Sequence, residues 1–126
     1  DEFIISAENN KVTPDQLRAT PMKAIMKSLP VNLNSEKAID TIQTVSFSFS
    51  DSTEIFTIRI RKGVAELSFL PAEKNDLKIN SDQQTLKETL AGLRNIASIS
   101  LSLANDTIQV EGGNIEFLKF LGLFTD

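Results

Sequence analysis

The sequence contains no histidine, cysteine, tryptophan or tyrosine. Without histidine, the chain lacks the commonest general base at neutral pH and the commonest metal ligand. Without cysteine, it can form no disulfide, no thiolate nucleophile and no thiolate metal site. A Ser-His-Asp triad and a histidine-based zinc site are therefore excluded within these 126 residues, and we expect neither catalysis nor a cofactor.

A basic patch is also missing. The net charge is −4, and the 13 lysines and arginines are scattered along the chain. Proteins that bind phosphate backbones normally present a basic face, and anionic membranes attract clusters of basic residues. All 8 aromatic residues are phenylalanine, so indole and phenol stacking platforms are absent too. We therefore expect neither nucleic-acid binding nor adsorption to anionic membranes.

Long hydrophobic runs are absent as well. No apolar stretch reaches the roughly 20 residues that a membrane-spanning helix needs. The chain starts at Asp1, with no initiator methionine and no signal-like basic segment before an apolar run. We expect it to be a piece of a longer protein, with a lead-in segment at residues 1–12 and a single domain at residues 13–126.

Two helices are predicted near the start of the chain. Thr13 and Gln16 have the spacing of a capping box, which marks the start of the first helix. Thr20 is the expected cap of the second helix, which should end near Leu29 because Pro30 follows. The apolar residues of this second helix have helical spacing: Met22, Ile25, Met26 and Leu29.

The pattern then changes to the two-residue period of strands. Apolar and polar residues alternate over residues 45–50, 56–61 and 65–69, with short links between them. Three consecutive strands so connected predict an antiparallel meander. Short strands are also expected at residues 77–79 and 108–110. With the helices, this layout predicts an α+β fold in which helices pack on one face of a single sheet.

Two further helices are predicted in the second half, and one segment is ambiguous. A helix should begin at Asp82 and end near Gly92, and the last helix should follow the glycine pair Gly112-Gly113. Within residues 96–103, isoleucine or leucine alternates with serine from Ser98 to Leu103, which favours a strand. The same residues also have helical spacing, so the local pattern leaves both structures open.

Three polar motifs were considered as sites. Gly112-Gly113-Asn114 before a helix is typical of a phosphate nest, but the spacing of known phosphate loops is missing, which favours a turn and helix cap. Arg59 and Arg61 fit either a clamp for a sulfate or an exposed strand face, and we favour the exposed face. The carboxylates do not converge on an acid–base pair: Asp51, Asp76, Asp82, Asp106, Glu111 and Glu116.

Phenylalanines are the most distinctive chemical feature that is present. They lie on the predicted strands and on the last helix, where residues 117, 120 and 124 are all phenylalanine. They either fill a core or line an apolar cavity between the sheet and the helices, which the sequence pattern cannot distinguish. In the second case, the expected lining is Phe47, Phe49, Phe56, Ile58, Phe69, Leu86, Leu90, Phe117, Phe120 and Leu121.

Taken in order, several short segments resemble the C-terminal domain of bacterial linear alkylsulfatases. The resemblance runs from about Val12 to Phe124. It rests on the segments LRATPM at 17–22, VNLN at 31–34, KA at 37–38, RKGV at 61–64, the stretch from 77 through the Leu86/Leu90 helix, and IQVEG at 108–112. The sequence departs from the family where Gly113 replaces an aspartate and where an aromatic pair is replaced around residues 24–26.

This resemblance implies a fold similar to sterol carrier protein type 2, with a five-stranded, largely antiparallel sheet covered on one face by helices. It also implies a short helix at residues 96–103, which we adopt. The function it implies is non-catalytic: an apolar pocket that holds an alkyl chain, a fatty acid or a sterol-like molecule. A separate zinc domain of the metallo-β-lactamase type would cleave the sulfate.

Other interpretations remain beside this one. The domain is alternatively a structural module that packs Phe3-Ile4-Ile5 or the last helix against a parent catalytic domain or a second copy in a homodimer. The sequence leaves the compartment open: periplasmic or secreted if the chain follows the bacterial alkylsulfatases, cytoplasmic otherwise.

Overall fold

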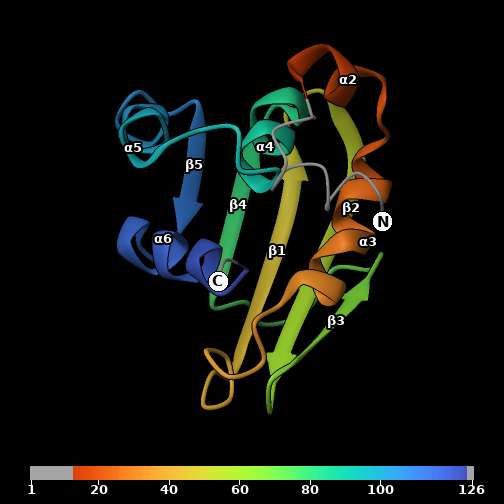
Figure 1. The fold of residues 1–126 in the computed structure, drawn as a ribbon, viewed down its shortest axis with the longest axis vertical. Coiled ribbons are helices and arrows are strands. Elements are labelled where there is room, and N and C mark those ends of the chain that lie inside the picture. Colours follow the sequence, from red (N-terminus) through yellow and green to blue (C-terminus); the bar gives the residue numbers. More distant parts are fainter. Residues whose placement is uncertain (1–12, 125–126) are drawn as a thin grey trace.

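The computed structural model describes residues 13–124 of the chain (Figure 1). The predicted lead-in at residues 1–12 lies outside the described residues, as do residues 125–126. Helices and strands follow one another in this order, with the labels of Figure 1: α2 (Pro14–Ala19), α3 (Met22–Asn32), β1 (Gln43–Phe49), β2 (Ser52–Arg61), β3 (Val64–Ser68), β4 (Leu77–Ser81), α4 (Gln83–Leu90), α5 (Ile96–Ala104), β5 (Ile108–Glu111) and α6 (Asn114–Gly122).

The five strands form one sheet in the order β3-β2-β1-β4-β5. β1, β2 and β3 pair antiparallel, which confirms the predicted meander, and β5 pairs antiparallel with β4. β1 and β4 are parallel, with Val45 opposite Leu77. The sheet is therefore mostly antiparallel, and its one parallel pair lies at the centre.

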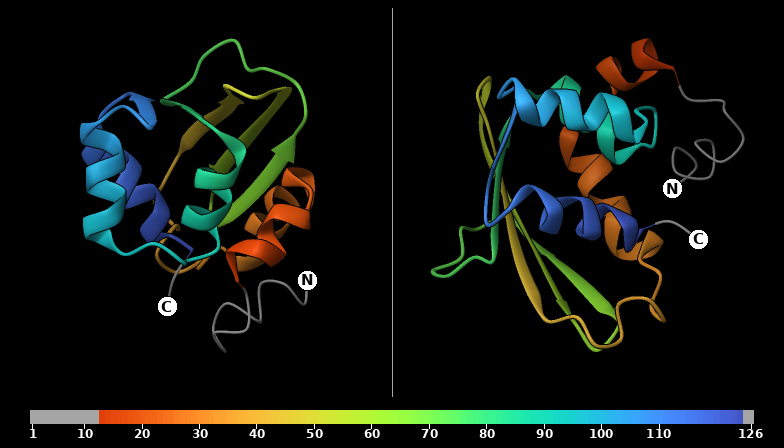
Figure 2. Two further views of the ribbon diagram at one scale, coloured as in Figure 1. Left: turned by 90° about the horizontal axis from the view of Figure 1, so that it is seen from above. Right: turned by 90° about the vertical axis from the view of Figure 1, so that its left-hand side faces the viewer.

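β3 lies at one edge of the sheet, and β4 lies on the far side of β2 and β1. The chain must therefore pass across β2 and β1 before β4 can pair with β1. Residues 69–76 make this crossing on the face of the sheet that carries no helices (Figure 2). The Thr57 hydroxyl donates a 2.8 Å hydrogen bond to the Leu70 carbonyl, and the Thr44 N–H donates to an Asp76 carboxylate oxygen at 2.8 Å. These bonds hold the crossing against β1 and β2, and β4 follows directly after Asp76.

All the helices of the described chain lie on the other face of the sheet, as the fold prediction stated (Figure 2). The core between the two layers is aromatic. Phe47 and Phe56 project from the strands and Phe117 and Phe120 from α6, and each is at most 2% exposed. Burying one such side chain contributes about 1.5–3 kcal/mol, so these phenylalanines, together with the aliphatic residues of the core, stabilise the packing of helices on the sheet.

Most of the predicted helix starts are confirmed. Thr13 and Gln16 form the capping box of α2. The Asp82 side chain caps α4 by accepting from the Thr85 N–H at 2.9 Å. The ambiguous segment is helix α5, and the Asn95 side chain caps it. This confirms the helix that the family resemblance implies, against the strand that the local alternation favours.

Three local predictions were wrong. Thr20 does not cap α3, because its hydroxyl donates to the Gln16 carbonyl and closes α2. α3 continues past Pro30 to Asn32. A proline only biases the residue before it away from helix, and Leu29 is held in place by burial. β3 ends at Ser68, so Phe69 lies beyond the strand and is 46% exposed.

Candidate apolar binding pocket

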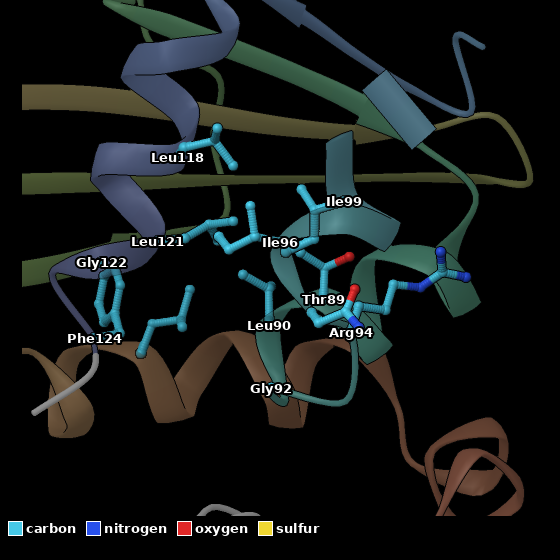
Figure 3. A pocket seen from close by; sticks show the side chains of 12 residues that line it. Thr89, Leu90, Gly92, Arg94, Ile96, Ile99, Leu118, Leu121, Gly122 and Phe124 are labelled. Carbon is cyan, nitrogen blue, oxygen red and sulfur yellow. The ribbon is translucent and has the colours of Figure 1, made fainter. Parts of the chain in front are cut away.

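An apolar pocket of about 430 Å³ opens among the helices (Figure 3). It lies outside the layer of buried phenylalanines, with helices on several sides and the α4–α5 link at one end. Most of its wall is aliphatic. The residues that line it are Leu29, Thr89, Leu90, Gly92, Arg94, Asn95, Ile96, Ile99, Leu118, Leu121, Gly122 and Phe124.

Helix α6 separates the core from the pocket. Phe117 and Phe120, one helical turn apart, are buried at 0% and 1% exposure and belong to the core. Leu118 and Leu121 each follow by one residue, are half-buried and line the pocket. One helix with apolar residues around most of its circumference therefore serves two apolar regions, which explains why the last helix carries so many large apolar side chains.

The opposite wall comes from α4 and α5. Leu90 is the last residue of α4, and Ile96 and Ile99 lie on the first turns of α5. Between the two helices, Gly92 has φ +78°, a left-handed conformation that glycine adopts without strain. This short turn brings Leu90 and Ile96 to the same opening, where Figure 3 shows their side chains directed toward Leu121.

The polar groups of the lining are already hydrogen-bonded. Among the described residues that line the pocket, Arg94 is the only charged one, and its guanidinium contacts Glu88 at 3.1 Å. The Thr89 hydroxyl donates to the Thr85 carbonyl at 2.8 Å. The Asn95 side-chain oxygen accepts from the Ser98 N–H at 2.8 Å. The pocket thus offers an aliphatic surface, and its polar side chains are already hydrogen-bonded within the protein.

The structure divides the residues predicted to line a cavity among three regions: the pocket, a separate hollow and the core. Leu90 and Leu121 line the pocket. Phe69 lies at a separate hollow of about 300 Å³, which Phe56 also lines. The other members of the predicted set belong to the core cluster: Phe47, Phe49, Phe56, Ile58, Leu86, Phe117 and Phe120.

Several lining residues were not in the predicted set. Leu29, Ile96, Ile99 and Leu118 all lie at apolar positions of their helices, and the sequence analysis had assigned such positions to the core or to no site. Leu29 and Ile99 are buried members of the core cluster that also reach the pocket, whereas Leu118 is half-buried. Finding them required the packing of four helices and not the pattern of any single one.

The polar motifs have structural roles. A Cβ at Gly112 would lie 2.2 Å from the Asp76 carbonyl oxygen, so glycine is needed for this close approach. Gly113 is the N-cap of α6, without a side-chain hydrogen bond, as predicted for a turn and cap. Arg59 and Arg61 are exposed on the face of the sheet that carries no helices.

Neither metal clusters nor membrane helices occur in the described part of the chain. Within residues 13–124, no three acidic side chains lie close enough together to hold a metal ion. None of the helices in that range has the length and apolarity to cross a membrane.

Comparison with known proteins identifies relatives of this fold. The model of the alkyl sulfatase C-terminal family matches residues 10–126. A linear primary-alkylsulfatase of Pseudomonas sp. (strain ATCC 19151) is 26% identical over 113 residues, which cover 90% of this chain and 21% of that protein. The stereoselective inverting sec-alkylsulfatase Pisa1 from Pseudomonas sp. superposes with a TM-score of 0.75 at 20% identity, covering 86% of this chain and 17% of that one.

A smaller protein shares the fold over most of its own length. Sterol carrier protein 2 from Yarrowia lipolytica, in its apo form, superposes with a TM-score of 0.62 at 13% identity, covering 79% of this chain and 86% of that one. These comparisons confirm the predicted resemblance and the sterol carrier-like fold. The chain spans 21% of the length of the curated relative and corresponds to the C-terminal region of the alkylsulfatases.

Proposed function

Because the chain belongs to the alkyl sulfatase C-terminal family, we propose that its pocket holds the alkyl chain of an amphiphile such as an alkyl sulfate or a fatty acid. The observation that carries the proposal is the wall of the pocket. Four helices contribute aliphatic side chains to it: Leu29 from α3, Leu90 from α4, Ile96 and Ile99 from α5, and Leu118 and Leu121 from α6.

The size and chemistry of the pocket support an aliphatic guest. A volume of about 430 Å³ lies in the roughly 300–1,000 Å³ range of small-molecule sites. An apolar wall cannot orient a polar ligand by hydrogen bonds, but it removes methylene groups from water. Each buried methylene contributes about 0.8 kcal/mol to binding, so an alkyl chain gains affinity with every carbon that enters.

The role we propose is accessory. In a parent alkylsulfatase, this domain would hold the aliphatic part of a substrate while a separate catalytic domain removes the sulfate. The absence of histidine and cysteine from the sequence is consistent with this division. The alkylsulfatases named above are several times longer than the region that this chain covers, which leaves room for a catalytic domain.

Native mass spectrometry of the purified domain tests the proposal. After addition of a fatty acid or an alkyl sulfate at low concentration, we expect a protein species whose mass is increased by one ligand. A bound amphiphile carried over from expression would also support the proposal. If neither added nor carried-over amphiphile is found under conditions that preserve a control lipid-binding protein with its ligand, the proposal is wrong.

Assembly is the second candidate, and the outer face of α5 favours it. The helix contains no charged residue, and Leu101 is 65% exposed. On α6, Ile115 is 69% exposed. Exposed apolar positions of this kind mark contact surfaces between proteins when they gather in one patch. Light scattering separates the two functions, because a stable dimer without amphiphile binding supports assembly alone.

A further inference from the structure

We infer that the pocket recognises the alkyl chain and not the head group, so that its ligands are single-chain amphiphiles whatever the charge of the head. This inference rests on the proposed function and adds which part of the ligand the pocket recognises. It follows from how the charged and polar groups around the pocket are bonded.

Among the described residues, Arg94 is the cation best placed to bind an anionic head group, but its guanidinium is already bonded to other side chains. Its Nε and one terminal nitrogen each lie 3.1 Å from the same Glu88 carboxylate oxygen, and its other terminal nitrogen donates to the Ser102 hydroxyl at 3.2 Å. The guanidinium therefore bridges α4 and α5. Figure 3 shows the Arg94 side chain running away from Leu90 and Leu121, so its charge is directed away from the apolar space.

Glu88 is itself fixed, which makes the Arg94 pair difficult to open. The other Glu88 carboxylate oxygen accepts from the Gln84 side chain at 2.9 Å. The Glu88 and Arg94 side chains are 18% and 26% exposed, so water screens this pair less than a surface pair. To bind Arg94, an anionic head group would have to displace the Glu88 carboxylate, which the Gln84 side chain also holds in place.

The other cations of this region offer only screened attraction. Lys37 does not line the pocket, but its ammonium lies 3.5 Å from the carbonyl of Gly122, which does. Lys37 is exposed, and exposed ion pairs are worth at most about 1 kcal/mol, roughly a fivefold change in affinity. Arg59 and Arg61 lie on the opposite face of the sheet, out of reach of the pocket.

A sulfate ester and the alcohol formed when its sulfate is removed should therefore bind with similar affinity. The free energy of binding then comes from the methylenes that both molecules share. In a parent enzyme that hydrolyses alkyl sulfates, the same domain would hold the substrate and the released alcohol alike.

The test is a calorimetric titration of the domain with decyl sulfate, decanoate and decanol, each below the concentration at which it aggregates. We expect the three dissociation constants to agree within about fivefold, because an exposed cation such as Lys37 offers an anionic head only screened attraction. A preference of roughly tenfold or more for an anionic head would overturn the inference, since this is the effect of one charge-assisted hydrogen bond. Binding with such a preference would leave the proposed function intact.

Two variants assign any preference to its source. Arg94→Gln and Lys37→Gln each remove one cation, and the ratio of the sulfate to the decanol constant is compared, so a general loss of affinity or stability cancels. We expect this ratio to stay near its wild-type value in Arg94→Gln. A rise of this ratio of dissociation constants by roughly tenfold in that variant would show that Arg94 contacts the head group. Failure of all three compounds to bind the wild-type domain would overturn the inference together with the proposed function.

Discussion

The ring of Phe47 on β1 lies 6.0 Å from the ring of Phe120 on α6, centroid to centroid, and both side chains are at most 1% exposed. This contact joins the central strand to the last helix. The residue after Phe120 is Leu121, which lines the pocket. Phe120 therefore sets the position of α6 on the sheet, and with it the position of the pocket wall.

The first prediction concerns this contact. Phe120→Ala should lower the free energy of unfolding by about 3–5 kcal/mol, because it leaves a cavity in a filled aromatic core. Phe124→Ala is the matched control, since Phe124 also contacts Phe120 but is only half-buried. Urea unfolding monitored by circular dichroism measures both. Equal losses for the two variants would show that the core does not depend on the position of Phe120.

The second prediction separates pocket from core. Leu90→Ala should weaken binding of an alkyl chain by about 1–2 kcal/mol, since a pocket-lining side chain loses contact with roughly two methylenes. Leu67→Ala is the control, because Leu67 is equally half-buried but lies on β3, outside the pocket lining. Its affinity should match that of the wild-type domain. Identical affinities in both variants would place the ligand elsewhere.

The third prediction concerns a substitution that fills part of the pocket. Gly122 lines it, and a Cβ built at Gly122 would have no heavy atom within 4 Å. Gly122→Leu should therefore fold with unchanged or slightly higher stability, because glycine is unfavourable in a helix by about 1 kcal/mol. It should also bind alkyl chains more weakly, in proportion to the space that the new side chain occupies.

Gly122→Ala is the graded control for this variant, with most of the binding retained. Thermal unfolding and calorimetric titration measure both properties on the same samples. Wild-type affinity in a well-folded Gly122→Leu would argue against this pocket as the site of the alkyl chain.

The fourth prediction concerns the bridge between α4 and α5. Glu88→Gln should lower the free energy of unfolding by about 1–2 kcal/mol, because it removes a charged hydrogen-bond partner from the partly buried Arg94. Glu116→Gln is the control. The Glu116–Lys119 pair spans 3.5 Å on an exposed helix face, and its loss should cost less than about 0.5 kcal/mol. Similar losses would indicate that the bridge contributes no more than a surface pair.

Much of the fold could be predicted from local patterns. The alternation of residues 45–50 and 56–61 fixed which strand positions face the core, and the caps at Thr13 and Asp82 marked two helix starts. These features depend on neighbours in the sequence. The predicted end of α3 near Leu29 was wrong, because a proline only disfavours helix at the residue before it, and here that residue, Leu29, is buried in the helix.

The pocket was harder to predict for a physical reason. Helix α6 is apolar around most of its circumference, so its sequence does not say which apolar face meets the sheet. The sequence pattern left open whether Phe117 and Phe120 fill a core or line a cavity, and the structure places both in the core. Only the packing of α6 against β1, and of α4 against α5, shows which side of α6 faces the core and which side faces the pocket.

A chain-length series measures what the pocket does. Alkyl sulfates of increasing length, titrated into the domain below their aggregation concentrations, should bind more tightly by about 0.8 kcal/mol for each methylene until the pocket is full, and no more tightly beyond that length. This result would establish burial of an alkyl chain as the source of affinity. Affinity that does not change with chain length, or a limiting chain length in Gly122→Leu equal to that of the wild-type domain, would contradict alkyl-chain binding in this pocket.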